Sequence, residues 1–343
     1  MTQSKLIYGM FALLYVCSVS AGFAEDQLTL SKQMRSAIVK AIPTLEAGTI
    51  GSANERQCFT CHSQALPVFT LKEAKNRGFA IDSENLRRQL KHTHEHLKRG
   101  LDGYREAKGQ GGGALTAGYA MWTLEVGEWP ADEVTEAVNH YLLELQKDLK
   151  HWRHRGTRPP TSGSDFTVTY VALRSLNHFG TETQRVQIDV RRKEVAQWIF
   201  SKPADETEDM VFRLSSLRYL DIEPKQIEQA VSALKAKQRD NGGWGQMDDM
   251  ASDAYATGSA LVALMEEGHV SKTDPAIEKG IEYLLKTQAA DGTWHVATRA
   301  KPVQEYFVSG FPYEKDQFIS ISATAWSTLA LIVALPSNGG VNH

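Results

Sequence analysis

Cysteine is scarce in this sequence, with three residues among 343. This argues against a secreted disulfide scaffold, which carries an even set of cysteines at long spacings. An excess of positive charge is also absent, because 38 Lys and Arg stand against 41 Asp and Glu, giving a formal net charge of −3. Nucleic acid is therefore not an expected partner. We expect a small molecule or another protein instead.

Long apolar runs are absent except at the N-terminus, where a single Lys5 precedes an apolar run from residue 6 to about residue 19. Small residues follow this run. The layout is typical of a secretory signal cleaved after Ala21 or Ala24, and an uncleaved membrane anchor is the alternative. We expect residues 1–24 to be removed, leaving a periplasmic or otherwise exported protein with no membrane span after cleavage.

The two cysteines outside this segment lie in the stretch QCFTCHSQALP, where Cys58, Cys61 and His62 have the spacing C-x-x-C-H. Two cysteines this close together form a very small loop if they are joined, so a disulfide between them stabilises little. Covalent haem attachment needs two thiols for the two vinyl groups, followed by a histidine for the iron. The motif therefore predicts haem c bound covalently through Cys58 and Cys61, with His62 as the proximal iron ligand.

Two other chemistries remain open for these cysteines. A dithiol oxidoreductase places C-x-x-C at the start of a helix in a βαβ pattern, and the flanking segments show no strand signal. A structural zinc site needs two further ligands, which could come from His92, His94 and His96.

The second axial ligand of the predicted haem is not fixed by the sequence. No methionine occurs between His62 and Met121, so a sulfur ligand would have to be Met121 or a later methionine. The stretch KHTHEHLKRG offers His92, His94 and His96 instead, and on a helix His92 and His96 share one face. An open sixth position and a purely solvated helix face are the alternatives.

Strand signals are nearly absent, and a repeated pattern fills the rest of the chain. Glutamine recurs six residues before tryptophan in three stretches, and each is followed by small and hydroxyl residues that lead into an apolar helix. Self-similarity at long intervals is typical of repeat architecture. The pattern predicts an all-α unit of outer helix, turn and inner helix, with the tryptophan packed across neighbouring helices. The three pairs are Gln146 and Trp152, Gln238 and Trp244, and Gln288 and Trp294.

The stretches KGIEYLLKTQAADGTW and VSALKAKQRDNGGW resemble the QW motifs of squalene-hopene and oxidosqualene cyclases. The resemblance covers about residues 110–335. It implies the α/α toroid that these cyclases share with protein prenyltransferase β subunits.

The chain as a whole resembles a group of exported bacterial proteins that combine an N-terminal C-x-x-C-H motif with segments like RPP, SDFT, SDAYATG and DQFIS. In this sequence these segments begin at Arg158, Ser164, Ser252 and Asp316. The resemblance implies no particular activity. We expect a signal peptide at 1–24, a small helical haem module at 25–105 and the α/α toroid at 106–338, and the alternative is a chain with no boundary at 105.

The resemblance to the cyclases implies a fold more than a reaction. The D-x-D-D general acid of that family has no counterpart, because Asp248, Asp249 and Asp253 form D-D-x-x-x-D. The zinc site of the prenyltransferases requires a cysteine in the toroid, and none follows Cys61.

A second group of candidate catalytic residues lies in the predicted toroid. Asp165 and Asp253 stand at the starts of two inner helices, where capping is the structural alternative. His295 and Arg299 lie in a long loop rich in aromatic and polar residues. We expect these four side chains to meet at the mouth of a central cavity.

The expected function is that of an exported c-type haem protein. It would act in electron transfer with a redox partner protein or in haem-linked oxidation, with the toroid holding a hydrophobic ligand or partner. The alternatives are a terpenoid cyclase-like enzyme without D-x-D-D chemistry and a non-catalytic binding module, so the sequence does not decide whether the protein is an enzyme.

Overall fold

The computed structural model describes residues 4–156, 158–301 and 306–336, with side chains described from residue 28 onward. The side chains of the predicted signal segment, residues 1–24, lie outside the described residues. All regular elements of the described chain are helical, and its β-bridge is an isolated one between Gly245 and Ser252. The prediction of an all-α protein is confirmed.

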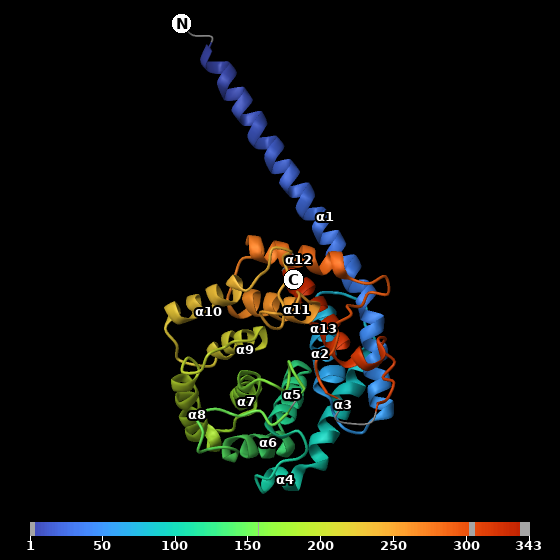
Figure 1. Ribbon diagram of the computed structural model, residues 1–343, viewed down its shortest axis with the longest axis vertical. Helices are drawn as coiled ribbons and strands as arrows, with labels where there is room; N and C mark the ends of the chain where they lie inside the picture. The colour runs from blue at the N-terminus through green and yellow to red at the C-terminus, as the bar shows by residue number, and fades with distance from the viewer. Residues whose placement is uncertain (1–3, 157, 302–305, 337–343) are drawn as a thin grey trace.

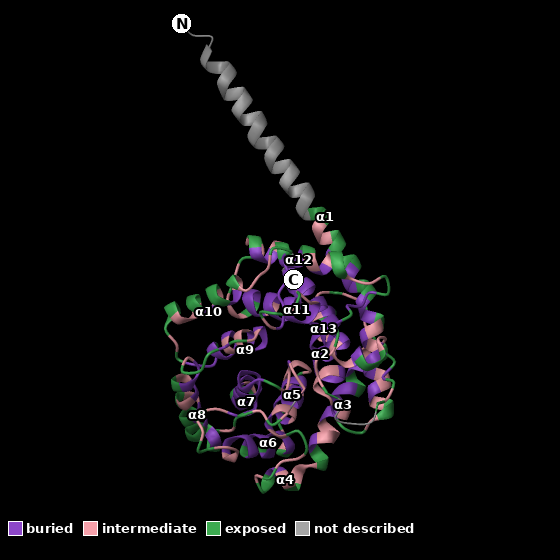
Figure 2. Cartoon of the chain, in the orientation of Figure 1, coloured by how far each residue is buried: buried purple, intermediate pink, exposed green. Residues whose placement is uncertain are grey.

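The inner helices form a closed ring (Figure 1). Around this ring each helix packs against the next, and the last, α13, packs against both α11 and α2. Figure 2 shows that these helices are largely buried. They are α2 (Leu66–Asn76), α5 (Gly113–Val126), α7 (Asp165–Phe179), α9 (Thr207–Leu217), α11 (Ala254–Val262) and α13 (Gln317–Ala334).

The outer helices lie around this ring, and their exposed residues face outward (Figure 2). They alternate with the inner helices along the chain, as the predicted repeat unit requires. The outer helices are α1 (Ser4–Glu55), α3 (Ser83–Arg99), α6 (Glu133–Glu144), α8 (Arg185–Trp198), α10 (Pro224–Ala236) and α12 (Pro275–Thr287). Shorter helical segments complete the described chain: η1 (Cys61–Ala65), α4 (Leu101–Arg105), η2 (Glu182–Gln184), η3 (Ala263–Glu267) and η4 (Glu314–Asp316).

Short polar side chains set where several of these helices begin. Asp82 accepts hydrogen bonds from two backbone N–H groups at the start of α3, and Asp132 forms a capping box with Thr135 at the start of α6. Asp253 caps α11 as predicted. The cap of α7, however, is Ser164, and the neighbouring Asp165 is the first residue of the helix, so its carboxylate serves other partners.

The Gln/Trp turns have a shared geometry. In each turn the tryptophan Nε1 donates to the carbonyl of the residue ten positions earlier, which lies in the last turn of the preceding outer helix. A threonine of the following inner helix accepts the tryptophan backbone N–H. The Nε1 to O distances are 2.9 Å for Trp152 to Leu142, 2.8 Å for Trp244 to Leu234 and 2.9 Å for Trp294 to Leu284. The structure thus shows the architectural role predicted for these tryptophans.

The residues before position 105 share the core of the ring. One hydrophobic cluster contains residues from Met34 to Leu335, and α2 packs between α13 and α5. Thr70 of α2 donates through its hydroxyl to the Ala325 carbonyl of α13, at 2.9 Å. The predicted boundary at 105 therefore does not separate two cores, and the independent folding of residues 25–105 stays a prediction.

One helical segment of the described chain, Glu314–Ala334, is long and apolar enough to cross a membrane by length and composition. The sequence predicts no such segment after the N-terminus. Of its most apolar window, 83% is buried inside the protein, as in the core helix of a soluble fold. Its apolar character follows from its place in the ring, where neighbouring helices cover it.

Candidate functional site

A cavity of about 1180 Å³ lies among η1, the start of α5, the loop between α6 and α7, and the start of α13. Ligand pockets in proteins usually measure about 300–1,000 Å³, so this cavity can hold a large organic group. Apolar side chains from four separate segments form part of its wall, among them Phe59, Leu115, Val168 and Phe318.

The complete C-x-x-C-H motif lines this cavity. Cys58, Cys61 and His62 are all part of its wall, and both cysteines are free thiols. The turn that presents them is held by Gln64, whose side-chain oxygen accepts the Thr60 backbone N–H at 2.7 Å. Gln64 is itself buried and donates to Gln89 of α3 at 3.3 Å.

His62 carries a nitrogen without a partner. Its Nε2 is shielded from solvent and forms no hydrogen bond within the described chain. Its ring contacts Phe318 edge-on, with the ring centres 4.8 Å apart. Burial, and secondarily the nearby Arg158 charge, lower the pKa of His62 to about 3. The imidazole is therefore neutral at physiological pH, and its lone pair is available to a bound group.

The same geometry disfavours the other chemistries considered for the cysteines. Burial raises the pKa of the Cys61 thiol to about 12, so this thiol keeps its proton near neutral pH. The described chain also lacks the βαβ unit that carries redox C-x-x-C motifs. No group of three or more His, Cys, Asp or Glu side chains suited to a metal ion occurs among the described residues, so the predicted alternative zinc site is not assembled.

The histidines proposed from the sequence as distal ligands lie on α3, outside the lining of the cavity. His94 Nε2 is 2.7 Å from Asp132 Oδ2, and its ring stacks on Trp129. His92 Nε2 is 3.4 Å from the Cys58 carbonyl oxygen.

His96 and Met121 complete this set of proposed distal ligands. The Nε2 of His96 is 2.5 Å from the side-chain nitrogen of Gln110. Met121 is buried within α5 and also lies outside the cavity lining.

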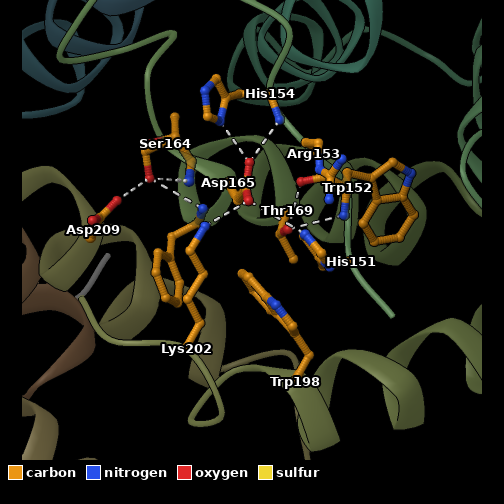
Figure 3. A network of polar contacts seen from close by, with 12 residues as sticks. His151, Trp152, Arg153, His154, Ser164, Asp165, Thr169, Trp198, Lys202 and Asp209 are labelled. Carbon is orange, nitrogen blue, oxygen red and sulfur yellow. Dashed lines mark hydrogen bonds and ion pairs between the residues drawn. The ribbon is translucent and has the colours of Figure 1, made fainter. Parts of the chain in front are cut away.

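A different histidine, His154, does line the cavity. It lies in the loop between α6 and α7, two residues after Trp152. Its Nδ1 is 2.6 Å from Asp165 Oδ1 (Figure 3). The sequence reasoning missed His154, although the density of charge in HWRHRGTRPP, directly after a predicted turn, is a signal for it.

The wall of the cavity is strongly basic although the chain as a whole is slightly acidic. No Asp or Glu occurs among the described residues that line it. A low-dielectric cavity lined by charge of one sign attracts ligands of the opposite sign. The cationic lining residues are Lys108, Arg153, Arg155, Arg158, Lys301 and Lys315.

None of the four candidates predicted for the mouth of the cavity is part of its lining. Asp253 accepts from Gln246, which also accepts from Arg299. His295 pairs with Asp316, with His295 Nε2 2.9 Å from Asp316 Oδ2.

Arg299 also forms an ion pair with Glu206. Asp165, the fourth candidate, binds His154 and Lys202 in a different part of the ring. Only Asp253 and Arg299 thus share a common partner, and His295 and Asp165 belong to separate clusters.

A buried acid that the sequence did not reveal lies in the first turn of α9. Glu208 of α9 is 3% exposed, and burial raises its pKa to about 8. Its carboxylate accepts hydrogen bonds from Thr167 at 2.9 Å and from Tyr255 at 3.1 Å. The Tyr255 hydroxyl is also 3.0 Å from the Thr161 hydroxyl, and Thr161 lines the cavity. A hydrogen-bonded chain therefore joins the acid to the cavity.

Residues 206–323 match the family described as the squalene-hopene cyclase C-terminal domain. The type II terpene cyclase MstE from Scytonema matches in structure with a TM-score of 0.57 at 15% identity, over 89% of this chain and 99% of the other. The chain is an all-α protein with a terpene cyclase-like α/α toroid. Because residues 106–338 make up well under 89% of the chain, the toroid includes helices that precede residue 106.

The same cyclase also matches in two complexes. With geranylgeranyl dihydroxybenzoate, its substrate, the TM-score is 0.56 at 15% identity. With merosterolic acid A, its product, the TM-score is 0.55 at 16% identity. Each match covers 90% of this chain and 99% of the other. Hydrophobic terpenoid molecules are thus what this structural relative binds.

Two curated squalene–hopene cyclases match parts of this chain in sequence. That of Bradyrhizobium diazoefficiens is 34% identical over 97 residues, and that of Zymomonas mobilis is 35% identical over 75 residues. These matches cover 25% and 17% of this chain and only 13% and 11% of the cyclases.

Proposed function

We propose that this protein is an exported c-type haem protein whose cofactor is attached within the cavity of the toroid, where it acts in electron transfer or haem-linked oxidation. The observation that carries the proposal is the placement of the complete C-x-x-C-H motif in the cavity wall, with His62 Nε2 shielded and unpartnered. A buried polar atom without a partner costs free energy unless a bound group satisfies it.

The residues of the cavity fit such a cofactor. Cys58 and Cys61 would form the two thioether links, and His62 would supply the proximal nitrogen. The cationic wall suits the two carboxylates that haem carries, and the apolar side chains suit its ring. When bound, haem supplies one-electron chemistry. The turn anchored by Gln64 would orient the group, and the surrounding chain shields His62 Nε2 from water.

The experiment is expression with cytochrome c maturation machinery. We expect a pigment that stays attached during acid-acetone extraction and denaturing electrophoresis, because thioether bonds survive unfolding and axial bonds do not. The double variant C58A/C61A should lose the retained pigment. His62→Ala should keep the pigment and lose its normal spectrum.

The matched control is His94→Ala, which removes a histidine that lies outside the cavity lining. This variant should retain both pigment and spectrum. A colourless wild-type protein from a host that matures other cytochromes c would overturn the proposal.

A second candidate function is acid chemistry on a hydrophobic chain, and Glu208 is the observation that favours it. The toroid relatives act on terpenoid substrates, and this chain lacks their D-x-D-D acid. Glu208 keeps a proton near neutral pH. For the transfer, Glu208 would donate its proton to the Tyr255 oxygen while Tyr255 donates to Thr161 and Thr161 to a double bond in the cavity. Loss of a proton from the resulting cation would leave an isomer of the substrate, and that proton would return to Glu208 along the same chain.

This second function is tested with a geranylgeranyl aromatic acid, whose carboxylate suits the basic wall. We expect an isomeric cyclised product from the wild type and none from Glu208→Gln. Tyr255→Phe, which interrupts the hydrogen-bonded chain but keeps the acid, should slow the reaction strongly. Recovery of only unchanged substrate with the folded wild type would overturn this function and leave the haem proposal standing.

A further inference from the structure

His154 has the geometry of a histidine prepared to bind a metal. It lines the same cavity as Cys58, Cys61 and His62, and its side chain is 35% exposed. Its Nδ1 lies 2.6 Å from Asp165 Oδ1. Because a carboxylate accepts this hydrogen bond, the proton of the neutral ring lies on Nδ1, and Nε2 is the nitrogen that keeps a lone pair. No hydrogen bond within the described chain uses that Nε2.

A carboxylate on the second ring nitrogen is the usual companion of metal-bound histidine, because it fixes the tautomer and the ring orientation. Asp165 is well held for this task. Its side chain is 7% exposed, and Lys202 Nζ donates to its Oδ2 at 2.8 Å. The backbone N–H of His154 donates to Asp165 Oδ1 at 2.9 Å. The same carboxylate thus fixes both the backbone and the ring of His154 (Figure 3).

The segment before His154 is equally fixed. Trp152 is fully buried, and its Nε1 donates to the Leu142 carbonyl. Thr169 of α7 bonds the Trp152 backbone on one side of the loop. His154 therefore extends from a rigid anchor only two residues away. Its position in the cavity wall is set by the toroid.

A neighbouring histidine provides a contrast. His151 Nε2 lies 3.4 Å from Asp165 Oδ2, and its ring stacks on Trp198 with the ring centres 4.3 Å apart. It is not part of the cavity lining. Two histidines thus share one carboxylate, and of these two only His154 belongs to the cavity lining.

We propose that His154 is the second axial ligand of the haem, and that Asp165 is the positioning residue that holds its ring. This inference rests on the proposed haem attachment at Cys58 and Cys61. His154 takes the place of the distal ligands predicted from the sequence. Those residues all lie outside the cavity lining: His92, His94, His96 and Met121. The inference also gives Asp165 a role that helix capping does not explain, since Ser164 is the cap of α7.

The test compares the visible and electron paramagnetic resonance spectra of the matured full-length protein and its variants. We expect a low-spin, six-coordinate haem in the wild type. His154→Ala should convert it to a high-spin form, and added imidazole should restore the low-spin spectrum. His151→Ala is the matched control, because it removes the other histidine beside Asp165, and it should stay low-spin.

Two further variants keep the test decisive if His154→Ala fails to fold. His154→Met should remain six-coordinate, with the spectrum of a sulfur ligand and a raised reduction potential. Asp165→Asn should keep the low-spin spectrum but shift the potential, because the ring nitrogen loses its anionic partner.

A retained pigment whose low-spin spectrum is unchanged in both His154 variants would overturn this inference and leave the haem proposal intact. A high-spin wild type with retained pigment would overturn it as well. Absence of retained pigment in the wild type would instead overturn the proposed function.

Discussion

His62 and Glu208 show how burial acts on single ionisable groups in this protein. Burial lowers the pKa of His62 to about 3 and raises that of Glu208 to about 8. The directions are opposite because histidine is charged when protonated and glutamate when deprotonated, and a low dielectric disfavours both charges. Each side chain is therefore held in its neutral form near pH 7. One offers a lone pair and the other a proton.

Glu208→Gln should change how stability depends on pH. In the unfolded chain Glu208 ionises near its ordinary value, whereas in the folded state it ionises at about pH 8. Between these values the folded state binds more protons, so the free energy of unfolding falls as the pH rises. The fall due to this group is on the order of 3–5 kcal/mol, and glutamine removes it.

The measurement is urea unfolding at a series of pH values from about 5 to about 8. Glutamine keeps the size of the side chain and can still bond Thr167 and Tyr255. Glu228→Gln, on the exposed face of α10, is the control and should leave the slope unchanged. Equal slopes for the wild type and Glu208→Gln would contradict the prediction.

At the scale of elements, the repeated Gln/Trp turn is the unit that joins each outer helix to the next inner helix. Gln288 donates to the Gly292 carbonyl of its own turn and to the Ala37 carbonyl of α1. Gly292 has a φ of +86°, and a Cβ there would lie 2.3 Å from the Lys40 carbonyl oxygen. The turn that contains Gln288 and Gly292 therefore packs closely against α1.

The first turn of the set differs from the others in the role of its glutamine. The Gln146 side-chain oxygen accepts the Arg153 backbone N–H at 2.8 Å, so it holds its own loop. That loop carries His154. The turn whose glutamine differs from the repeated pattern is therefore the one whose loop lines the cavity.

Trp294→Ala should destabilise the protein by about 3–5 kcal/mol, because it removes a fully buried aromatic side chain and leaves a cavity. It also leaves the Leu284 carbonyl without its partner. Chemical denaturation followed by circular dichroism measures the loss. Trp129→Ala, at a partly buried position, should cost clearly less. Equal losses for both variants would argue against an architectural role for the turn.

At the scale of the whole molecule, the ring is closed by helices that are far apart in the sequence. The first inner helix, α2, packs against the last, α13, and the first outer helix, α1, packs against α12 and α13. The C-x-x-C-H motif lies at this closure, directly before α2. Closing the ring is what places the motif in the cavity beside the loop after α6.

A fragment of residues 106–338 should fail to form a well-packed toroid. Without α1 and α2, the apolar face of α13 loses its cover. We expect retained far-ultraviolet circular dichroism, weakened near-ultraviolet signal, dye binding and a loss of cooperative unfolding. The mature chain from residue 25 is the control. Cooperative unfolding of the fragment would instead support the predicted boundary at 105.

The sequence by itself determined the features that depend on local pattern. Helix propensity with small-residue and apolar periodicity gives an all-α chain, and the spacing from Gln288 to Trp294 gives the turn, because both arise from neighbouring residues. The order of Cys58, Cys61 and His62 likewise specifies a motif without any knowledge of the fold. The cap of α11 by Asp253 was also predictable, since capping is a local hydrogen bond.

Only the tertiary structure decided which distant side chains share a cavity. His92, His94 and His96 are nearer to the motif in sequence than His154, yet α3 holds them outside the cavity lining and the loop after α6 brings His154 into it. Glu208 joins the cavity only through Tyr255 and Thr161, which belong to other segments. Sequence spacing does not encode these relations, because burial and proximity in a closed ring depend on how all its helices pack together.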